Sequence, residues 1–321
     1  MCGIIGFTGN LQAPGILVDG LQQLEYRGYD SAGIAVNNGS ETKIVKTTGK
    51  VATLREKVEA TADLAGTCGI GHTRWATHGG VTEVNAHPHV SGNVTLIHNG
   101  IIENYKELAA SLKTKGFTAI SETDTEVAAM LIDSLYDGDP FAALKEADKA
   151  LEGAYGFCVM FKDHPGEIYC IRNASPLVAS HTEDGSFIAS DMVALLKYTK
   201  DYFVVPEEHI VVMKADSITL YTMDGGVEEP KMLHVDWDTT AAQKGGYDFF
   251  MQKEIYDQPE ALHNTIMPRI HNGHADFSAD NISDDIFKGV NRVIVTACGT
   301  AWHAGLVGRH LIEAMIRSSC N

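Results

Sequence analysis

Met1-Cys2-Gly3-Ile4-Ile5-Gly6-Phe7 opens the chain, with a cysteine directly behind the first methionine and an apolar run after it. The side chain at position 2 is small, so we expect Met1 to be removed and Cys2 to become the N-terminal residue. Such a residue carries a nucleophile, its thiol, and a base, its own α-amine, whose pKa near ~8 leaves part of it unprotonated at neutral pH. The apolar run predicts a buried strand that would hold this terminus rigidly. The alternative is that Cys2 is only a small buried residue at the start of a strand.

Length and composition are those of an ordinary globular protein. The chain has 321 residues, of which 44% are hydrophobic and 21% charged, which allows one large domain or two smaller ones. A formal net charge of -17 disfavours nucleic acid and anionic membranes as partners. No signal peptide precedes Cys2, and no apolar run is long enough to span a bilayer. The cysteines form no C-x-x-C pair. We therefore expect a cytoplasmic protein, in a reducing compartment that keeps Cys2 reactive.

The order of the predicted elements indicates an α+β fold. Strand-rich ends surround a helical middle, which suggests stacked sheets with helices outside them. Helical patterns cover residues 10–26, 51–64, 104–115, 125–136 and 141–151. Short strands are predicted over residues 32–36, 43–47, 68–73, 94–98, 155–161, 167–172, 177–180, 187–189, 209–214 and 218–222.

A polar, glycine-terminated segment over 238–246 indicates a domain boundary. Beyond it we predict a helix over 249–266, an apolar strand over 292–297 and a helix over 302–316. Strand, glycine turn and helix are how a parallel α/β domain begins, and such a turn can face a phosphate, so Thr300 is a candidate phosphate contact. One strand and one helix cannot complete such a sheet. We expect this second domain to be cut short, and poorly ordered or aggregation-prone alone.

Two polar stretches carry residue types suited to binding and catalysis. In the run 71–79, the fork of Arg74 suits a substrate carboxylate, and the alternative is a surface arginine packed on Trp75. The strand 94–98 is predicted to stop at Asn99-Gly100. There, a side-chain amide and a glycine N–H are the two neutral donors that a tetrahedral oxyanion needs. The alternative is a plain Asn-Gly turn.

A third stretch, 121–126, opens a helix. Asp124 there is suited to a substrate ammonium group, whereas helix capping by Thr123 or Asp124, worth ~1 kcal/mol, is the alternative. The histidines between 72 and 98 suggest a metal site, but no spacing among them matches a zinc motif, and His87-Pro88-His89 forces an extended turn. We therefore expect no metal.

Six stretches, in order, closely resemble the glutamine–fructose-6-phosphate aminotransferase (isomerizing) family, also called glucosamine-6-phosphate synthases. They are residues 1–4, 24–33, 72–79, 85–89, 98–105 and 121–126. The resemblance implies a class II glutamine amidotransferase domain over 1–235, which is an N-terminal-nucleophile hydrolase with a four-layer αββα sandwich. It also implies a linker over 236–250 and the N-terminal part of a first sugar isomerase (SIS) domain, an α/β domain, over 251–321.

The same resemblance implies the chemistry. Cys2 would attack the side-chain amide of L-glutamine, form a γ-glutamyl thioester and release ammonia, and water would then free glutamate. The family's motifs assign Asn99 and Gly100 to the oxyanion hole. They assign Arg74 and Asp124 to the α-carboxylate and α-amine of glutamine, Thr77 and His78 to a loop that closes over the site, and Trp75 to the gate of an ammonia channel.

In the whole enzyme, ammonia would convert fructose 6-phosphate to glucosamine 6-phosphate, with no cofactor and as a homodimer joined through the SIS part. Members of this family run to about twice this length, so we expect this chain to carry the glutamine-hydrolysing half and an incomplete sugar site. The alternatives are a glutaminase-only fragment or an inactive glutamine-binding fragment. Among enzymes that share the domain, the runner-up is amidophosphoribosyltransferase, whereas asparagine synthetase would need an ATP pyrophosphatase loop that the sequence lacks.

Overall fold

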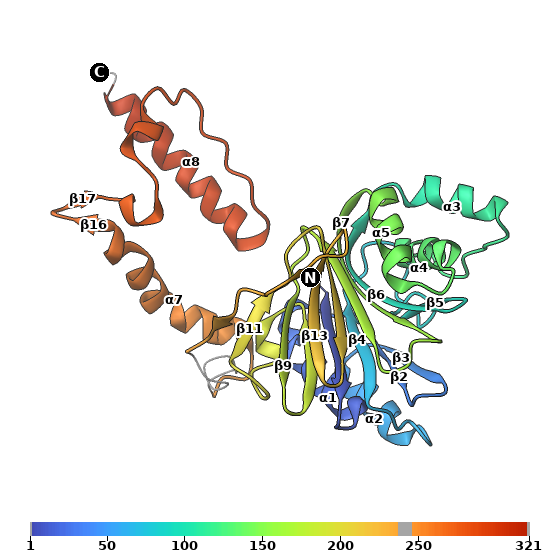
Figure 1. Cartoon of the computed structure of the whole chain (residues 1–321). Helices are drawn as coiled ribbons and strands as arrows, with labels where there is room; N and C mark the ends of the chain where they lie inside the picture. Colours follow the sequence, from blue (N-terminus) through green and yellow to red (C-terminus); the bar gives the residue numbers. More distant parts are fainter. Residues whose placement is uncertain (1, 237–245, 320–321) are drawn as a thin grey trace. The chain divides into compact units, whose positions relative to one another are not determined.

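The structure is a computed structural model that describes residues 2–236 and 246–319. The chain divides into two compact units, Met1–Gly246 and Tyr247–Asn321, and each is described by itself (Figure 1). The expected removal of Met1 and most of the expected linker 236–250 lie outside the described residues. The assignment of the second unit to a SIS domain stays a prediction.

Two antiparallel sheets form the centre of the first unit (Figure 1). One sheet consists of β1 (Gly3–Gly9), β2 (Ser31–Asn37), β3 (Thr42–Thr48), β4 (Cys68–Arg74), β9 (Val178–Thr182), β10 (Gly185–Ala189), β11 (Asp201–Val204) and β15 (Leu233–His234). Its order is β15-β11-β9-β10-β1-β4-β2-β3. The other consists of β5 (His89–Ser91), β6 (Val94–Ile102), β7 (Gly153–Phe161), β8 (Ile168–Asn173), β12 (His209–Lys214), β13 (Ser217–Thr222) and β14 (Val227–Glu228). Its order is β14-β13-β12-β8-β7-β6-β5.

Five helices cover the outer faces of these sheets. They are α1 (Ala13–Gln23), α2 (Val51–Ala60), α3 (Tyr105–Thr114), α4 (Asp124–Leu135) and α5 (Pro140–Ala150). One apolar cluster joins α1 and α2 to the first sheet, a second lies between the two sheets, and a third joins α3, α4 and α5 to the second sheet. The predicted α+β fold with four αββα layers is confirmed.

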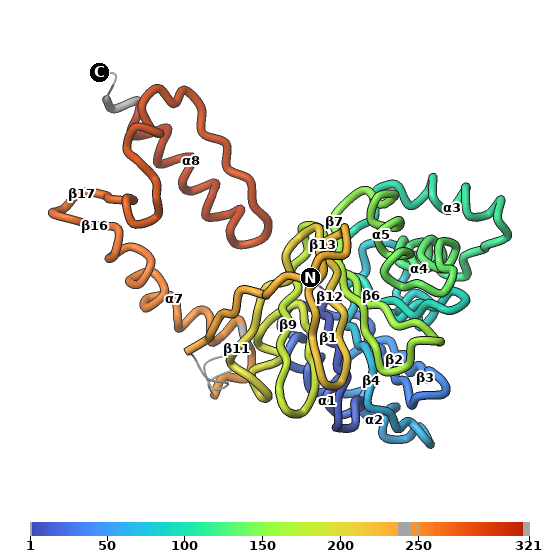
Figure 2. The backbone as a smooth tube through the Cα atoms, viewed as in Figure 1, coloured from blue at the N-terminus to red at the C-terminus, as the bar shows by residue number. Residues whose placement is uncertain are grey.

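Strand β1 runs through the middle of the first sheet, between β10 and β4 (Figure 2). Its side chains alternate between two apolar cores. Ile5 and Phe7 pack in the cluster beneath α1, whereas Ile4 packs between the sheets. Burial on both faces explains why the opening of the chain is a continuous apolar run and not an alternating one. The predicted buried strand behind Cys2 is confirmed.

The sequence predicted that the strand stops at Asn99-Gly100, and that prediction is wrong. β6 continues through both residues to Ile102, and Gly100 is paired with Tyr155 of β7. Gly100 has φ +135°, and a Cβ there would lie 1.9 Å from the carbonyl oxygen of Ala154. Glycine is therefore needed because the neighbouring strand approaches closely, and no chain reversal occurs at this point.

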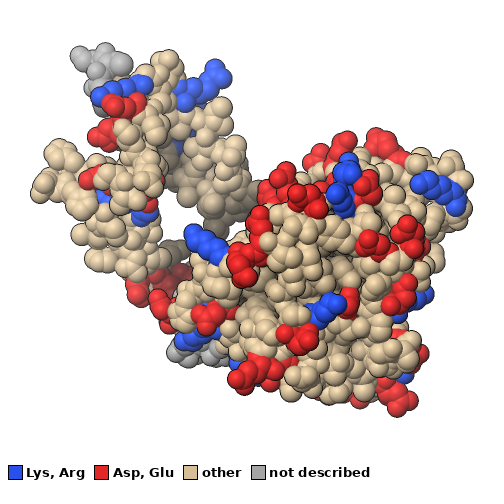
Figure 3. Space-filling model, in the orientation of Figure 1, with Lys and Arg blue, Asp and Glu red and all other residues tan. Residues whose placement is uncertain are grey.

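Acidic side chains are spread over the visible face of the first unit, with fewer lysines and arginines between them (Figure 3). They do not gather into a single patch in that view. The visible face therefore presents no single acidic surface that would mark a binding site. In the described parts of the chain, no helix is both long and apolar enough to cross a membrane.

The second unit consists mainly of two helices, α7 (Phe250–Ile266) and α8 (Gly299–Ser319), with a small hairpin of β16 (Ile270–His271) and β17 (His274–Ala275). The strand predicted over 292–297 does not form, so that prediction is wrong. A strand needs a neighbour for its N–H and C=O groups, and the described residues of this unit offer 292–297 none. α8 begins at Gly299, earlier than the predicted residue 302.

Candidate active site around Cys2

Cys2 lies where the start of β1 meets the second sheet. Its side chain has the same parity along the chain as Ile4, which packs between the sheets. The backbone N–H of Trp75 donates to Cys2 Sγ at 3.2 Å, and Asn99 Nδ2 donates to the Cys2 carbonyl oxygen at 3.1 Å. Segments far apart in the sequence thus meet at this thiol.

The thiol of Cys2 is not activated by its surroundings alone. Burial raises its pKa above the ordinary value, while the hydrogen bond from the Trp75 N–H opposes that effect. A thiol with a raised pKa reacts only when a nearby base removes its proton. The α-amine of an N-terminal Cys2 would be such a base, one backbone unit away.

The amide of Asn99 is held on both sides. Its Oδ1 lies 3.0 Å from Nε2 of His72, which is on β4 and fully buried. Its Nδ2 faces Cys2, and an amide nitrogen carries two hydrogens, of which the Cys2 oxygen takes one. Gly100 follows directly in the same strand. The structure therefore brings the two predicted oxyanion residues to the end of the chain that carries Cys2.

Arg74, the last residue of β4, is buried with 3% of its surface exposed, whereas Trp75 is 55% exposed. Arg74 Nη1 donates to the Gly80 carbonyl at 3.0 Å and Nη2 donates to the His78 carbonyl. The alternative of a surface arginine packed on Trp75 is therefore wrong. A buried guanidinium beside Cys2 is suited to an anionic group.

The loop 75–80 contains the other predicted binding residues. His78 Nδ1 lies 3.3 Å from Thr77 Oγ1, and its ring stands edge-on to Tyr105 at 5.4 Å between centroids. The ring of Trp75 lies against Gly28, where a Cβ would come within 2.1 Å of it. These contacts hold the loop beside Cys2, while the substrate and gate roles remain predictions.

Asp124 is the first residue of α4 and is buried. Its Oδ2 accepts a hydrogen bond from the Ile102 N–H at 2.9 Å. The strand that carries Asn99, β6, therefore also positions Asp124. The capping alternative belongs to Thr123, whose hydroxyl accepts from the Glu126 N–H at 3.2 Å. Capping therefore does not compete with a binding role for Asp124.

Two acidic residues that the sequence analysis did not single out hold the loop 75–80. Asp30 accepts from the backbone N–H of Ala76. Glu122 Oε2 accepts from the Gly80 N–H at 3.0 Å and from Asn85 Nδ2 at 2.8 Å. The only available signal in the sequence was that both carboxylates lie inside two of the six stretches that carry the resemblance, 24–33 and 121–126.

The histidines between 72 and 98 bond mainly to neutral groups. His87 and His98 both contact the hydroxyl of Thr125, and His89 contacts that of Thr123. Over residues 2–236 and 246–319, no group of three or more His, Cys, Asp or Glu side chains is placed to hold a metal ion.

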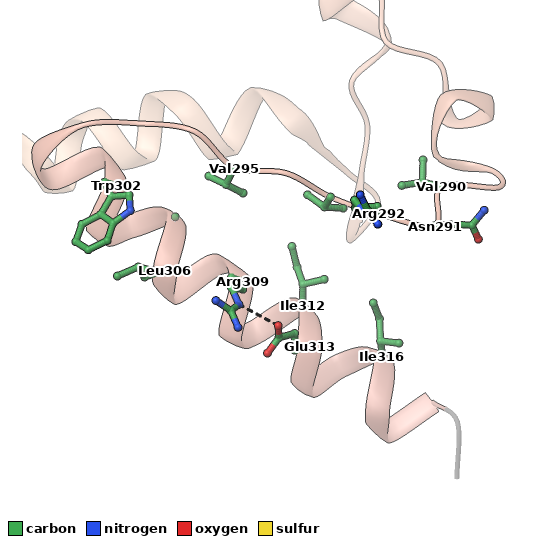
Figure 4. Close-up of a pocket in the computed structure, with 12 residues that line it drawn as sticks. Val290, Asn291, Arg292, Val295, Trp302, Leu306, Arg309, Ile312, Glu313 and Ile316 are labelled. Carbon is green, nitrogen blue, oxygen red and sulfur yellow. Dashed lines mark hydrogen bonds and ion pairs between the residues drawn. The ribbon is translucent and has the colours of Figure 1, made fainter.

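A hollow in the second unit is lined mainly by apolar side chains of 290–295 and of one face of α8 (Figure 4). Along α8, Arg309 Nε pairs with Glu313 Oε1, one turn further on, at 3.0 Å (Figure 4). Thr300 lies in the first turn of α8, is exposed and does not line this hollow. Its role as a phosphate contact stays a prediction.

Residues 72–197 match the family described as a glutamine amidotransferase domain. The chain is 42% identical to the glutamine–fructose-6-phosphate aminotransferase (isomerizing) of Clostridium acetobutylicum, over 99% of this chain and 52% of that protein. It is 46% identical to the enzyme of that name from Thermus thermophilus, with the same coverage of 99% and 52%. The chain thus spans about half the length of these relatives.

A solved structure similar to this chain is that of glutamine phosphoribosylpyrophosphate amidotransferase from B. subtilis, complexed with ADP and GMP. The TM-score is 0.61 at 26% identity, covering 70% of this chain and 50% of that one. An allosteric regulatory enzyme of purine biosynthesis matches with a TM-score of 0.61 at 27% identity, over 69% of this chain and 49% of its own.

Proposed function

We propose that Cys2 hydrolyses the side-chain amide of L-glutamine to glutamate and ammonia. The premise is the class II glutamine amidotransferase domain, of the N-terminal-nucleophile type, that this chain carries. One observation carries this proposal. Asn99 Nδ2 lies 3.1 Å from the carbonyl oxygen of Cys2, which places a neutral hydrogen-bond donor beside the residue that carries the thiol. A site that only bound an amino acid would need neither the thiol nor this donor.

The proposed reaction begins after removal of Met1. The free α-amine takes the proton of the Cys2 thiol, and Sγ attacks the amide carbon of glutamine. The electron pair of the C=O bond moves to oxygen, and the oxyanion accepts hydrogen bonds from Asn99 Nδ2 and the Gly100 N–H. When the intermediate collapses, the C–N bond breaks, and the nitrogen takes the proton from the α-ammonium and leaves as ammonia. Water, deprotonated by the α-amine, then cleaves the thioester to glutamate and the thiol.

The substrate's α-substituents would be held by two buried charges. A guanidinium has five N–H groups, and in Arg74 two nitrogens already bond to His78 and Gly80, so further hydrogens remain for the α-carboxylate. Asp124, fixed by the Ile102 N–H, would take the α-ammonium. Thr77 and His78 would close over the bound amino acid.

In a longer protein like the relatives, this half would supply ammonia to a sugar. The activity in the name of these relatives and the identity of 42–46% over 99% of the chain favour fructose 6-phosphate over a phosphoribosyl acceptor, whose representative is 26% identical. Such an enzyme would be a cytoplasmic homodimer, with Trp75 gating the ammonia path. Residues 251–321 would begin its SIS domain, in which Thr300 would contact the sugar phosphate.

The test is glutamate release from L-glutamine by the purified chain, with and without fructose 6-phosphate, beside Cys2→Ala. We expect release that depends on Cys2, is independent of the sugar and is accompanied by a mature N-terminus lacking Met1. No Cys2-dependent release from folded chain with Met1 removed would leave a glutamine-binding fragment. Formation of glucosamine 6-phosphate would show that the sugar half is functional.

A further inference from the structure

Four buried histidines lie behind the candidate active site and have no part in the chemistry proposed above. His72, His87, His89 and His98 come from β4, the loop before β5, β5 and β6. The rings of His72 and His87 are 4.0 Å apart between centroids, and those of His87 and His89 are 4.9 Å apart. Of the four, His72 is the one whose hydrogen bond reaches a predicted catalytic residue, Asn99.

The protonation state of His72 follows from its surroundings. Complete burial lowers its pKa to about 3, so the imidazole is neutral near pH 7 and carries one N–H. Its Nε2 lies 3.0 Å from Asn99 Oδ1. An amide oxygen only accepts hydrogen bonds, so that single hydrogen is on Nε2. Nδ1 is buried and has no hydrogen-bond partner among the described residues, as expected for the unprotonated nitrogen.

The amide orientation of Asn99 is determined independently from its other side. The Cys2 carbonyl oxygen only accepts, so the Asn99 atom that faces it at 3.1 Å is the nitrogen. The donor His72 and the acceptor Cys2 therefore require the same orientation. A residue without a donor at position 72 would leave Oδ1 unpaired and remove one of the two constraints against a 180° flip of the amide. The flipped amide would present its oxygen, and not its N–H, to a developing oxyanion.

We infer that His72 is a positioning residue for amide hydrolysis, which acts through Asn99 by keeping its N–H directed toward the reacting centre. This inference rests on the proposed function, because it assigns Asn99 a part in stabilising the oxyanion. It predicts an effect on turnover and not on glutamine binding, since His72 does not contact the substrate pocket residues Arg74 or Asp124 through any hydrogen bond that the structure shows.

The test compares His72→Gln with His72→Met. The two replacements have nearly the same length, but only glutamine has an amide N–H that can donate to Asn99 Oδ1. Removing an oxyanion donor lowers kcat by ~100- to 1000-fold. A donor that is misoriented for only part of the time should lower kcat less, by roughly 10- to 100-fold. We expect His72→Met to show this loss with KM for glutamine changed less than about threefold. His72→Gln should recover most of the lost kcat.

Two further readouts separate positioning from damage to the fold. Thermal unfolding shows whether each variant is folded, and His72→Asn, which is polar but too short to reach Asn99, replaces His72→Met if the latter does not fold. Alkylation of Cys2 by iodoacetamide, followed in the N-terminal peptide by mass spectrometry, needs no oxyanion donor. Its rate should therefore be the same in the native protein and in both variants.

Native kcat in a folded variant without a donor would overturn the inference. So would equal losses in folded His72→Gln and His72→Met, or a loss of kcat that is matched by slower alkylation of Cys2. A native chain without Cys2-dependent glutamate release would instead contradict the proposed function, and this inference with it.

Discussion

Arg74 Nη1 lies 3.0 Å from the carbonyl oxygen of Gly80, to which it donates a hydrogen bond. The residue proposed to bind the substrate carboxylate thus also holds the loop 75–80. The same carbonyl oxygen accepts from Asn85 Nδ2, and the N–H of Gly80 donates to Glu122. Substrate binding and the position of the loop should therefore depend on the same guanidinium.

We expect Arg74→Lys to raise KM for glutamine by roughly 10- to 100-fold, because an ammonium cannot replace a planar fork that serves two carbonyls and a carboxylate. Steady-state glutamate release checks this. Arg55→Lys is the matched control, because Arg55 pairs with Asp19 outside the site, at 2.8 Å, and should leave KM unchanged. An unchanged KM in Arg74→Lys would show that the arginine holds the loop without binding substrate.

The contact between Gly28 and Trp75 provides a second prediction. Gly28 has φ +97°, and a Cβ there would lie 2.1 Å from Trp75 Cε3. Gly39 has φ +94°, but nothing lies within 4 Å of its Cβ position. Gly28→Ala and Gly39→Ala should therefore both carry a backbone cost of about 1 to 3 kcal/mol in the free energy of unfolding, and Gly28, with ψ 148°, lies where glycine is most strongly favoured. Only Gly28→Ala should also displace Trp75, whose N–H bonds to Cys2 Sγ, and lower kcat.

Urea unfolding and glutamate release, measured on both glycine variants, separate these two effects. Equal kcat values in the two variants, with both proteins folded, would show that the ring position of Trp75 does not affect the thiol.

The buried histidines predict loss of stability in mild acid. Burial lowers the pKa of His72 and of His89 to about 3, and those of His87 and His98 also lie below the usual value. Below pH ~6.5 the unfolded chain takes up protons that the folded chain does not. The free energy of unfolding should therefore fall as pH drops from 6.5, by up to about 1.4 kcal/mol per pH unit for each histidine, until the folded-state pKa is reached.

Urea unfolding at several pH values between roughly 7 and 5 checks this prediction. Carboxylates contribute to the same slope, so His89→Gln is the informative comparison. This variant removes one group with a lowered pKa. The number of protons taken up on unfolding at pH 5 should therefore fall by nearly one, and the slope of the free energy of unfolding against pH should be smaller, even if stability at neutral pH is lower. An identical slope in His89→Gln would contradict a neutral, buried His89.

Lys46 should be an unusually reactive amine. Burial lowers its pKa to about 8, although Glu126 and Glu83 act in the opposite direction. Its Nζ donates to the Ala86 carbonyl at 2.6 Å. Pulse labelling with an acylating reagent, over roughly pH 7 to 10 and read by mass spectrometry, should give a midpoint near 8 for Lys46. Lys197, whose pKa is raised by its pairing with Asp19 at 2.9 Å, is the control. A shared midpoint would contradict the prediction.

The sequence predicted the layers and the candidate site better than the strand ends. Period and apolarity identified β1, and a serine- and threonine-rich start identified α4, because those signals are local. The Asn99-Gly100 dipeptide has the composition of a turn, but in the structure it is paired with β7. Glycine at 100 reflects the nearby Ala154 carbonyl, and no pattern within a single strand reveals such a tertiary contact.

Two other features could not be predicted from local patterns. β5 has only three residues, His89–Ser91, and its sequence reads as a turn because Pro88 precedes it. The hydrogen bond between His72 and Asn99 joins two sheets and residues 27 positions apart, whereas the sequence shows only that several histidines lie within one stretch. Conversely, the apolar stretch 292–297 has the composition of a strand, yet pairing decides whether a strand forms.

The central position of β1 has a consequence for the order of events during synthesis. Ile5 pairs with Ala189, so the first strand cannot gain its second neighbour until about that residue has left the ribosome. At ~5–20 residues per second, this leaves the N-terminus without its final partner for roughly 10 to 40 s. During that interval β1 can have only β4 as a neighbour, so one edge of β1 next to Met1 stays open to an aminopeptidase. Cleavage of Met1 within that interval would mature the nucleophile before the sheet that buries it is complete.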